Sequence, residues 1–388
     1  MTKGFGYMRG LSITLLCFAC VGIGGCLMKE SGGASGAVEE SSNEAVVEGN
    51  VVSNVVEWLK PYQMKIPFVV ENEGKDVFIR GNVGYFPALF SEYSIVIHLN
   101  AGSQKAYCYG YLPTRVPAER RADMIESLFR AECAYGLSPA TLVLQDDGMI
   151  RCQTWCRLSA LERSPEKTMP RFIGPAILKL FSCSHMVGSV LLGTNESEEV
   201  SKITPVEIFE RDKFDNKADT KTVLNACFSD GEYTVDGSAD DWFNDRFRNG
   251  DDSVGFIRAR FKGVSKDLGG LCDELEYTIV VKDGIACNIC VFPVEIPRNR
   301  INDVAEAAMR RNQSLNCALF CVDFENRKLW CRFSIPVSSF IDDFGTKEMT
   351  YNIVELHINT VAEVAKNYEL FSTIMAAGDS ESPKKTSF

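Results

Sequence analysis

Cysteine is the side chain with the greatest chemical potential in this sequence. Fifteen cysteines occur. Twelve remain once the three nearest the amino terminus are set aside, namely Cys108, Cys133, Cys152, Cys156, Cys183, Cys227, Cys272, Cys287, Cys290, Cys317, Cys321 and Cys331. Thiolates act as nucleophiles and metal ligands, and thiol pairs form disulfides in exported proteins. The spacing is not that of a disulfide-stapled small domain, so we expect small buried apolar residues, with one to three disulfides as the alternative.

Two cysteine pairs have spacings that invite a redox or zinc interpretation. Cys287 and Cys290 form a C-x-x-C motif, which in thioredoxin-type enzymes opens a helix that stabilises the thiolate. Here the motif lies in a predicted strand, where residues i and i+3 point to opposite faces. Cys152 and Cys156 share a strand face but are separated by about 13 Å at the usual rise, too far for a direct disulfide. Neither pair therefore predicts redox catalysis or a shared zinc ion.

The other potentially catalytic residues do not form a recognisable constellation. The three histidines are His98, His185 and His357, and none has the H-E-x-x-H spacing of metalloproteases. Ser184 and His185 are adjacent, whereas a nucleophile and its base must converge through the fold. Asp146-Asp147 is explained by a turn, and Asp240-Asp241 by a helix start. We therefore predict no catalytic, cofactor-binding or metal-binding residue, and a protein that is not an enzyme.

The charge of the chain limits its partners. The segment before Cys26 holds two basic residues, Lys3 and Arg9, and no acidic one. Of 41 Lys and Arg residues 39 therefore remain beyond it, against 52 Asp and Glu, a net charge of −13. A nucleic-acid binder needs a basic surface, so we exclude that class.

The basic run Arg115, Arg120 and Arg121 is interpreted as a solvated helix start rather than a phosphate site. The tryptophans Trp155, Trp242 and Trp330 are interpreted as core or sheet-face residues rather than a ligand platform.

The elements that must position these residues occur twice. Lys105–Leu158 and Ile285–Ile335 share a pattern, in which Pro113 and Pro117 recur 180 residues later as Pro293 and Pro297. After a shift of one residue, Cys152 matches Cys331. This periodicity indicates a tandem duplication.

Each copy reads as strand, helix, hairpin, helix. The prolines Pro113 and Pro293 are expected to stop the first strand, since proline donates no hydrogen bond to a sheet. Amphipathic helices are predicted for Pro117–Cys133 and Pro297–Gln313. Hairpins follow, with an Asp147-Gly148 turn between Thr141–Leu144 and Met149–Cys152 in copy one and a Glu325-Asn326-Arg327 tip in copy two. The last helices are Thr168–Leu192 and Lys347–Met375, and Pro170 and Pro175 predict a late start or kink in the former.

At these residues the chain resembles the YbjN family, whose domains share the fold of type III secretion chaperones. The resemblance rests on Tyr111–Pro117, Arg121 and Leu142–Gly148 in copy one, and on Phe292-Pro293, Ile296-Pro297, Arg300 and Asn312 in copy two. It implies a short helix and further strands before each copy. Segments suited to these places are Val51–Leu59, Pro67–Arg80 and Tyr93–Leu99, then Asp240–Arg248, Val254–Lys262 and Glu276–Val281. Copy two lacks the Asp-Gly turn and has an extra segment near Ser265–Asp273.

The amino terminus has the pattern of a targeting segment. Lys3 and Arg9 precede an apolar run, Leu11–Val21, too short for a stable membrane span. Ile23-Gly24-Gly25-Cys26 then resembles the lipobox of bacterial lipoproteins, which makes the Cys26 thiol the expected attachment site for diacylglycerol. A plain secretory signal or a short membrane anchor is the alternative. Leu27 rather than Asp follows Cys26, which favours the outer membrane within the cell envelope.

These observations predict an α+β protein made of two tandem repeats, each an antiparallel sheet with packed helices. The expected divisions are a signal peptide (residues 1–25), a flexible tether (26–50), a first YbjN-like domain (51–193), a linker (194–221), a second YbjN-like domain (222–375) and a disordered tail (376–388). Secretion chaperones of the resembled fold pair as dimers, so we expect the two copies to form an intramolecular pseudo-dimer.

The expected function is that of a non-enzymatic, lipid-anchored binding or scaffold protein with a chaperone-like role. A protein partner would meet the sheet and helix faces of the pseudo-dimer, and the membrane would be contacted only through the lipid. The alternative is a cell-envelope hydrolase or a thiol-redox protein whose site has no recognisable motif.

Overall fold

The computed structural model describes residues 47, 49–63, 67–84, 92–135, 138–163, 165–193, 255–262, 274–282, 285–292, 294–315, 318–336, 360, 363–364 and 366–376. The predicted signal peptide and linker lie outside these residues, as do nearly all of the predicted tether and tail and the predicted segments Asp240–Arg248 and Ser265–Asp273. The tether is shorter than predicted, because helix α2 (Gly49–Leu59) begins within it, and residue 376 of the predicted tail is helical. Eight candidate residues also lie outside the described part of the chain, namely Cys26, Cys227, Cys272, Cys317, His357, Trp242, Asp240 and Asp241. We call the described residues 47–193 the first half and 255–376 the second half.

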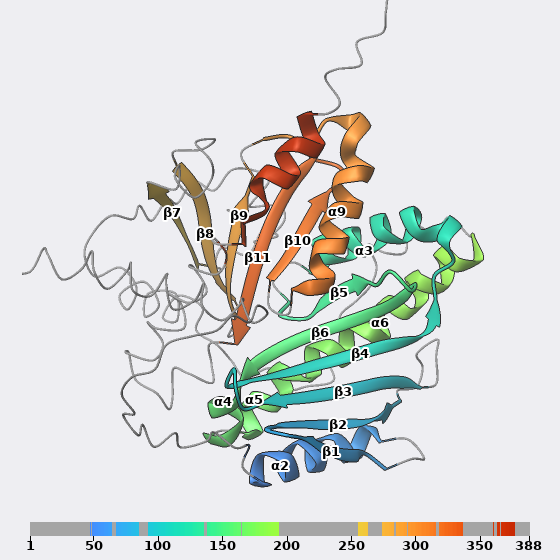
Figure 1. The fold of residues 1–388 in the computed structure, drawn as a ribbon, viewed down its shortest axis with the longest axis vertical. Helices are drawn as coiled ribbons and strands as arrows, with labels where there is room; N and C mark the ends of the chain where they lie inside the picture. The colour runs from blue at the N-terminus through green and yellow to red at the C-terminus, as the bar shows by residue number, and fades with distance from the viewer. Residues whose placement is uncertain are drawn as a thin grey trace, which may run out of the picture. The chain divides into compact units, whose positions relative to one another are not determined.

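The structure is α+β, with two antiparallel sheets and packed helices (Figure 1). The first sheet has six strands in the order β1-β2-β3-β4-β6-β5, and the second has five in the order β7-β8-β9-β11-β10. The strands are β1 (Val69–Glu73), β2 (Asp76–Val83), β3 (Tyr93–Asn100), β4 (Lys105–Arg115), β5 (Thr141–Leu144), β6 (Met149–Arg157), β7 (Gly255–Lys262), β8 (Glu274–Lys282), β9 (Ile285–Val291), β10 (Ala318–Asp323) and β11 (Lys328–Pro336). Apart from β1, the two sheets have the same strand order.

The first half begins with helix α2 (Gly49–Leu59), which buries Val51, Val55 and Leu59 at the four-residue spacing of one helix face. A short 3-10 helix, η1 (Lys60–Tyr62), follows it. The predicted extended segment Pro67–Arg80 is divided into β1 and β2 by a tight turn, because Gly74 has a φ of 65°. In β3 every second residue is buried, so one face of this strand points into the core.

The expectation that Pro113 stops its strand is wrong. Strand β4 continues to Arg115, and its pairing with β6 shifts register between Tyr111 and Arg115. A β-bulge tolerates proline because the ladder is already interrupted there. In the second half the matching strand β9 ends at Val291, and Pro293 lies outside the described residues.

The helix predicted after the two prolines is present in both halves. The 3-10 turn η2 (Ala118–Arg120) leads into α3 (Arg121–Tyr135), and η6 (Arg298–Arg300) leads into α9 (Ile301–Ser314). In α3 the buried apolar residues include Met124, Ile125, Leu128 and Phe129. In α9 they are Val304, Ala305, Ala308 and Met309. Each helix therefore turns an apolar stripe inward, as the sequence periodicity indicates.

The hairpin after each helix is fixed by the same backbone hydrogen bond. Val116 N–H donates to Gly148 O at 2.8 Å in the first half, and Ile296 N–H donates to Arg327 O at 2.8 Å in the second. Gly148 and Arg327 both have a left-handed backbone, with φ of 83° and 52°. Strand β5 has its predicted bounds, whereas β6 is longer than predicted and extends to Arg157 rather than Cys152. The turn centre also differs, because Gly148 N–H bonds Gln145 O, which places Asp146 and Asp147 between them.

The predicted helix Thr168–Leu192 is interrupted, as its prolines indicate. After α4 (Leu158–Arg163), helix α5 (Pro165–Phe172) contains Pro170, and α6 (Gly174–Leu192) starts with Pro175 in its first turn. The helical residues also begin earlier than predicted, at Pro165. Helix α6 packs on β4 and β6, and α2 packs on β2 (Figure 1). The stretch Thr168–Leu192 is apolar and long enough to cross a membrane by composition, but its many buried residues belong to this core.

The matching part of the second half is described only in part. Residues 366–376 are helical, as are 360 and 363–364, within the predicted helix Lys347–Met375. Tyr368 stacks on Phe292 and Phe371 packs edge-on against it, with ring centroids 5.8 and 5.5 Å apart. Strands β7 and β8 fall on the predicted segments Val254–Lys262 and Glu276–Val281.

The hairpin geometry predicts that Gly148→Ala destabilises the protein. A Cβ atom at this position would lie 2.5 Å from Val116 O, and the left-handed backbone adds strain for any L side chain. The expected loss is about 1–3 kcal/mol in urea unfolding. Gly102→Ala is the control, because the nearest atom to its Cβ would be 3.5 Å away. Equal losses for the two variants would contradict this account of the turn.

Candidate functional site at the junction of the two halves

The described candidate residues do not converge on a catalytic arrangement. His98 in β3 contacts the Asp76 carboxylate at 3.0 Å and stacks on Phe78, with ring centroids 4.4 Å apart. His185 lies on α6 with an exposed side chain. Its neighbour Ser184 is buried, and its hydroxyl donates to Phe181 O within the same helix at 2.6 Å. The side chains of Ser184 and His185 therefore point in different directions, as expected of neighbours in a helix.

The aspartates of the Asp146-Asp147 turn and the arginines of the basic run take part in hydrogen bonds and ion pairs. The Asp147 carboxylate accepts a hydrogen bond from Met149 N–H at 3.0 Å, as expected of a turn residue. Arg115 lies 3.5 Å from Asp147, and Arg120 lies 3.4 Å from Asp123. Arg121 reaches Glu306 of the second half at 3.1 Å. These arginines are thus held by carboxylates, which does not favour a phosphate site.

Nine of the predicted buried cysteines lie within the described residues, and all nine are buried and not joined in disulfides. Desolvation raises the pKa of the Cys152, Cys156 and Cys331 thiols well above the usual value. Burial also raises the pKa of Cys287 to about 11, although Arg332 and the Ser334 hydroxyl oppose the shift. Protonated, enclosed thiols are poor nucleophiles. The C-x-x-C motif lies inside β9 with both cysteines buried, as expected.

Metal binding finds no support in the part of the chain that the structure describes. No three His, Cys, Asp or Glu side chains among those residues are grouped to hold an ion.

The described candidate tryptophans, Trp155 and Trp330, are part of the packing. Trp330 has no exposed surface, and Trp155 packs edge-on against Phe333 of the second half, with ring centroids 5.7 Å apart.

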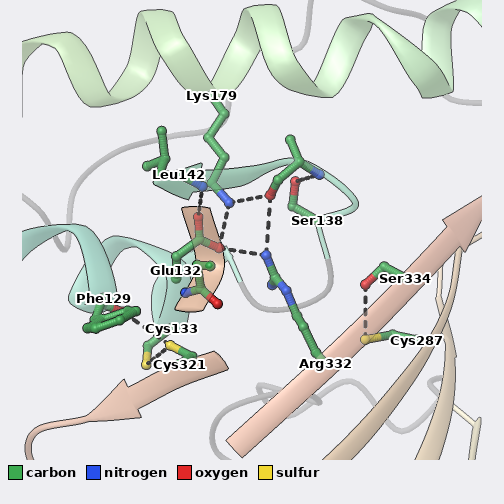
Figure 2. Close-up of polar contacts among 12 residues, drawn as sticks. Phe129, Glu132, Cys133, Ser138, Leu142, Lys179, Cys287, Cys321, Arg332 and Ser334 are labelled. Carbon is green, nitrogen blue, oxygen red and sulfur yellow. Dashed lines mark hydrogen bonds and ion pairs between the residues drawn. The ribbon is translucent and has the colours of Figure 1, made fainter. Parts of the chain in front are cut away.

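A fully buried ionic cluster joins the two halves instead. Glu132 from α3 contacts Lys179 of α6 at 2.8 Å and Arg332 of β11 at 2.5 Å (Figure 2). These three side chains are at most 1% exposed. The backbone completes the cluster, because Leu142 N–H donates to Glu132 at 2.6 Å, and Lys179 and Arg332 both donate to Ala140 O. One carboxylate thus binds two cations, one of them from the other half.

The second half has a neutral counterpart of Glu132. Asn312 lies 180 residues later, at the same place in α9. Its amide oxygen accepts a hydrogen bond from Phe320 N–H at 2.8 Å, and its amide nitrogen donates to Phe320 O at 2.7 Å. In both halves a helix side chain therefore holds the backbone of the following strand. In the first half that side chain also carries the charge that binds Arg332.

The contacts between the halves are reciprocal. Helix α3 packs on β10, helix α9 packs on β5, and the two helices contact each other (Figure 1). Strands β5 and β10 are the ends of their sheets, so each edge strand is covered by the helix of the other half. Gln313 of α9 donates to Leu144 O of β5 at 3.0 Å, and Leu144 N–H lies 3.2 Å from the Met309 sulfur.

The charged residues at the hairpin tips show the same reciprocal arrangement, in which an arginine on the helix of one half faces an acidic residue at the tip of the other. Arg130 binds Glu126 in its own helix at 2.8 Å and reaches Glu325 of the opposite tip at 3.2 Å. In α9, 180 residues later, Arg310 binds Glu306 at 2.8 Å. The hydrogen bond and charge of Glu306 raise the pKa of Arg310, and Asp146 of the opposite tip adds to this effect. Exposed pairs of this kind contribute little energy, so their value here is in orientation.

The sequence contains two signals for this cluster that motif reasoning missed. Glu132 follows Leu128 by four residues, which places a carboxylate on the buried stripe of the helix. Lys179 is the only Asp, Glu, Lys or Arg between Arg171 and Glu196. A charge inside each apolar stripe requires a partner. No local pattern marks Arg332 as that partner.

Comparisons with known proteins yield no relative: no family model matches the chain, and no curated protein matches it.

The cluster predicts unequal effects of removing its charges. Glu132→Gln leaves two buried cations without their carboxylate and is expected to cost about 3–5 kcal/mol of unfolding free energy. Lys179→Met leaves the Glu132–Arg332 pair intact and is expected to cost roughly half of that or less. Urea unfolding of the two variants measures the difference. A smaller loss for Glu132→Gln than for Lys179→Met would contradict the assignment of Glu132 as the shared anion.

Proposed function

We propose that the chain is a non-enzymatic, lipid-anchored binding or scaffold protein built from two YbjN-like domains that dock as an intramolecular pseudo-dimer. Its cargo or client is a protein, met through the sheet and helix faces of the docked pair. The observation that carries the proposal is the reciprocal cover of the two halves, in which each edge strand lies under the helix of the other.

The shared strand order supports a duplicated unit. Strands β2, β3, β4, β6 and β5 correspond in order to β7, β8, β9, β11 and β10. The bonds from Val116 to Gly148 and from Ile296 to Arg327 have the same length and the same place in the two hairpins. A strand that reaches a proline, then a helix, a hairpin and a second helix, in this order, are what the resemblance to the YbjN family implies.

Covalent linkage gives a physical reason for the doubling. A single unit would expose an edge strand and the side chains that the other half now covers, and such edges promote aggregation. Joining two units raises the effective concentration of the second to roughly millimolar. Each unit then needs to match only its fixed partner, which is consistent with Glu132 in one half and Asn312 in the other.

The buried thiols argue against the thiol-redox alternative. A redox site needs an accessible, low-pKa thiolate, and burial raises the pKa of the described thiols discussed above. Among the described residues the hydrolase alternative finds no convergent nucleophile and base, since the Ser184 hydroxyl is bound within its helix. Binding is the function class for which the described residues have the required features: a stable body and half-exposed sheet residues such as Val96 and Tyr109.

The anchor is the part of the proposal that Cys26 carries. Cys26→Ala is expected to abolish labelling with radioactive palmitate and to release the protein from the membrane fraction. The wild-type chain from detergent-solubilised membranes is expected to retain a protein partner at a fixed ratio, and the purified partner should rebind the purified chain. Persistent palmitate labelling of the variant overturns the anchor. Turnover of a thiol or ester substrate by purified chain, with no protein partner, overturns the binding function.

A further inference from the structure

Two cysteines from different halves meet at the junction. Cys133 lies near the end of α3 and Cys321 lies in β10, 188 residues further along the chain. Their sulfur atoms are 3.8 Å apart, and both side chains are buried (Figure 2). The Cys321 sulfur also lies 3.9 Å from Phe129 O in the same helix as Cys133. The pair is therefore enclosed by the packing of α3 on β10.

The separation is within reach of a covalent bond. A disulfide brings two sulfur atoms to about 2 Å, so the pair must close by roughly 2 Å. Rotation about the Cα–Cβ bonds moves sulfur by such a distance without moving the backbone far. In Figure 2 the two sulfur atoms lie on one side of Glu132, and the dashed contacts from Glu132 to Lys179 and Arg332 lie on the other. Closing the bond therefore breaks none of the ionic contacts.

Two other contacts of described cysteines lie within one half. Cys290 and Cys331 are directly opposite in the neighbouring strands β9 and β11, which belong to one sheet. Cys287 accepts a hydrogen bond from the Ser334 hydroxyl of the same sheet at 3.1 Å. A bond between Cys133 and Cys321 has a different consequence, since it would fasten a helix of the first half to the edge strand of the second.

We propose that Cys133 and Cys321 form a disulfide when the chain folds in an oxidising compartment, and that this bond locks the two halves together. The oxidant is a protein or small-molecule disulfide. The thiolate of one cysteine attacks that disulfide and forms a mixed disulfide, releasing one oxidant thiolate. The second cysteine thiolate then attacks the protein sulfur and releases the other. The protein loses two protons and two electrons, and the oxidant becomes a dithiol or two thiols.

The bond must form before docking is complete. Desolvation raises the pKa of Cys321 well above its usual value, and the contact with Cys133 adds to this. The docked Cys321 thiol is therefore protonated, and both buried sulfur atoms are shielded from an oxidant. The same shielding protects the finished bond from reductants. This inference rests on the proposed docking of the halves, and it adds a covalent lock to it.

Peptide mapping of the exported full-length chain tests the proposal. The protein is denatured without reductant, alkylated and digested with trypsin, which yields Ala131–Arg151 with Cys133 as one fragment and Asn312–Arg327 with Cys321 as another. The expected result is that most molecules carry these two fragments as a cross-linked pair. Cys317 lies in the second fragment, so Cys317→Ser is the matched control and should keep the cross-link. Cys321→Ser and Cys133→Ser should lose it.

Thermal unfolding supplies a second readout. Reduction of the folded wild-type chain after mild opening with urea is expected to lower its melting temperature by the order of 10 °C, because the bond closes a long loop. Cys133→Ala should show no such difference. Complete alkylation of Cys133 and Cys321 in the exported wild-type chain overturns the proposal, as does a cross-link that survives Cys321→Ser. If no cross-link is found and the halves are still docked, the lock is wrong and the pseudo-dimer stands.

Discussion

The packing of this protein depends on a carboxylate that has no access to water. Glu132 is buried with Lys179 and Arg332, and both cations and a backbone N–H face its carboxylate. Two of these groups come from the same half as Glu132, and Arg332 comes from the other. Separating the halves would leave a buried or newly hydrated charge on each side. The arrangement therefore couples the folding of the first sheet to the position of the second, and it sets a register that apolar packing alone does not specify.

The other interactions between the halves differ in how much they contribute to stability. The covered edges of β5 and β10 remove unpaired backbone groups from solvent, and the apolar stripes of α3 and α9 contribute the larger share of the burial energy. The ion pairs at the hairpin tips are exposed and weak, so they orient rather than hold. A body organised in this way is suited to presenting sheet and helix surfaces.

Much of the fold is predictable from local patterns because those patterns act locally. Pro117 and Pro297 mark helix starts, Gly148 marks a turn that needs a left-handed backbone, and alternation in Tyr93–Leu99 marks a half-buried strand. Pro113 misled for a physical reason: its missing N–H falls at a bulge, where the ladder is already broken. Glu132 and Lys179 are visible as charges within apolar stripes, whereas Arg332 and the meeting of Cys133 with Cys321 follow only from how the halves pack.

The central claim is that the two halves form one interlocked body, and cutting the connection between them tests it most directly. A protease site placed within residues 194–221 of the full chain allows the folded protein to be cleaved under reducing conditions and then passed over a size-exclusion column. The account predicts that the two fragments elute together in equal amounts and unfold in a single transition. Two fragments that elute separately, each soluble and as stable as the uncut chain, would contradict it.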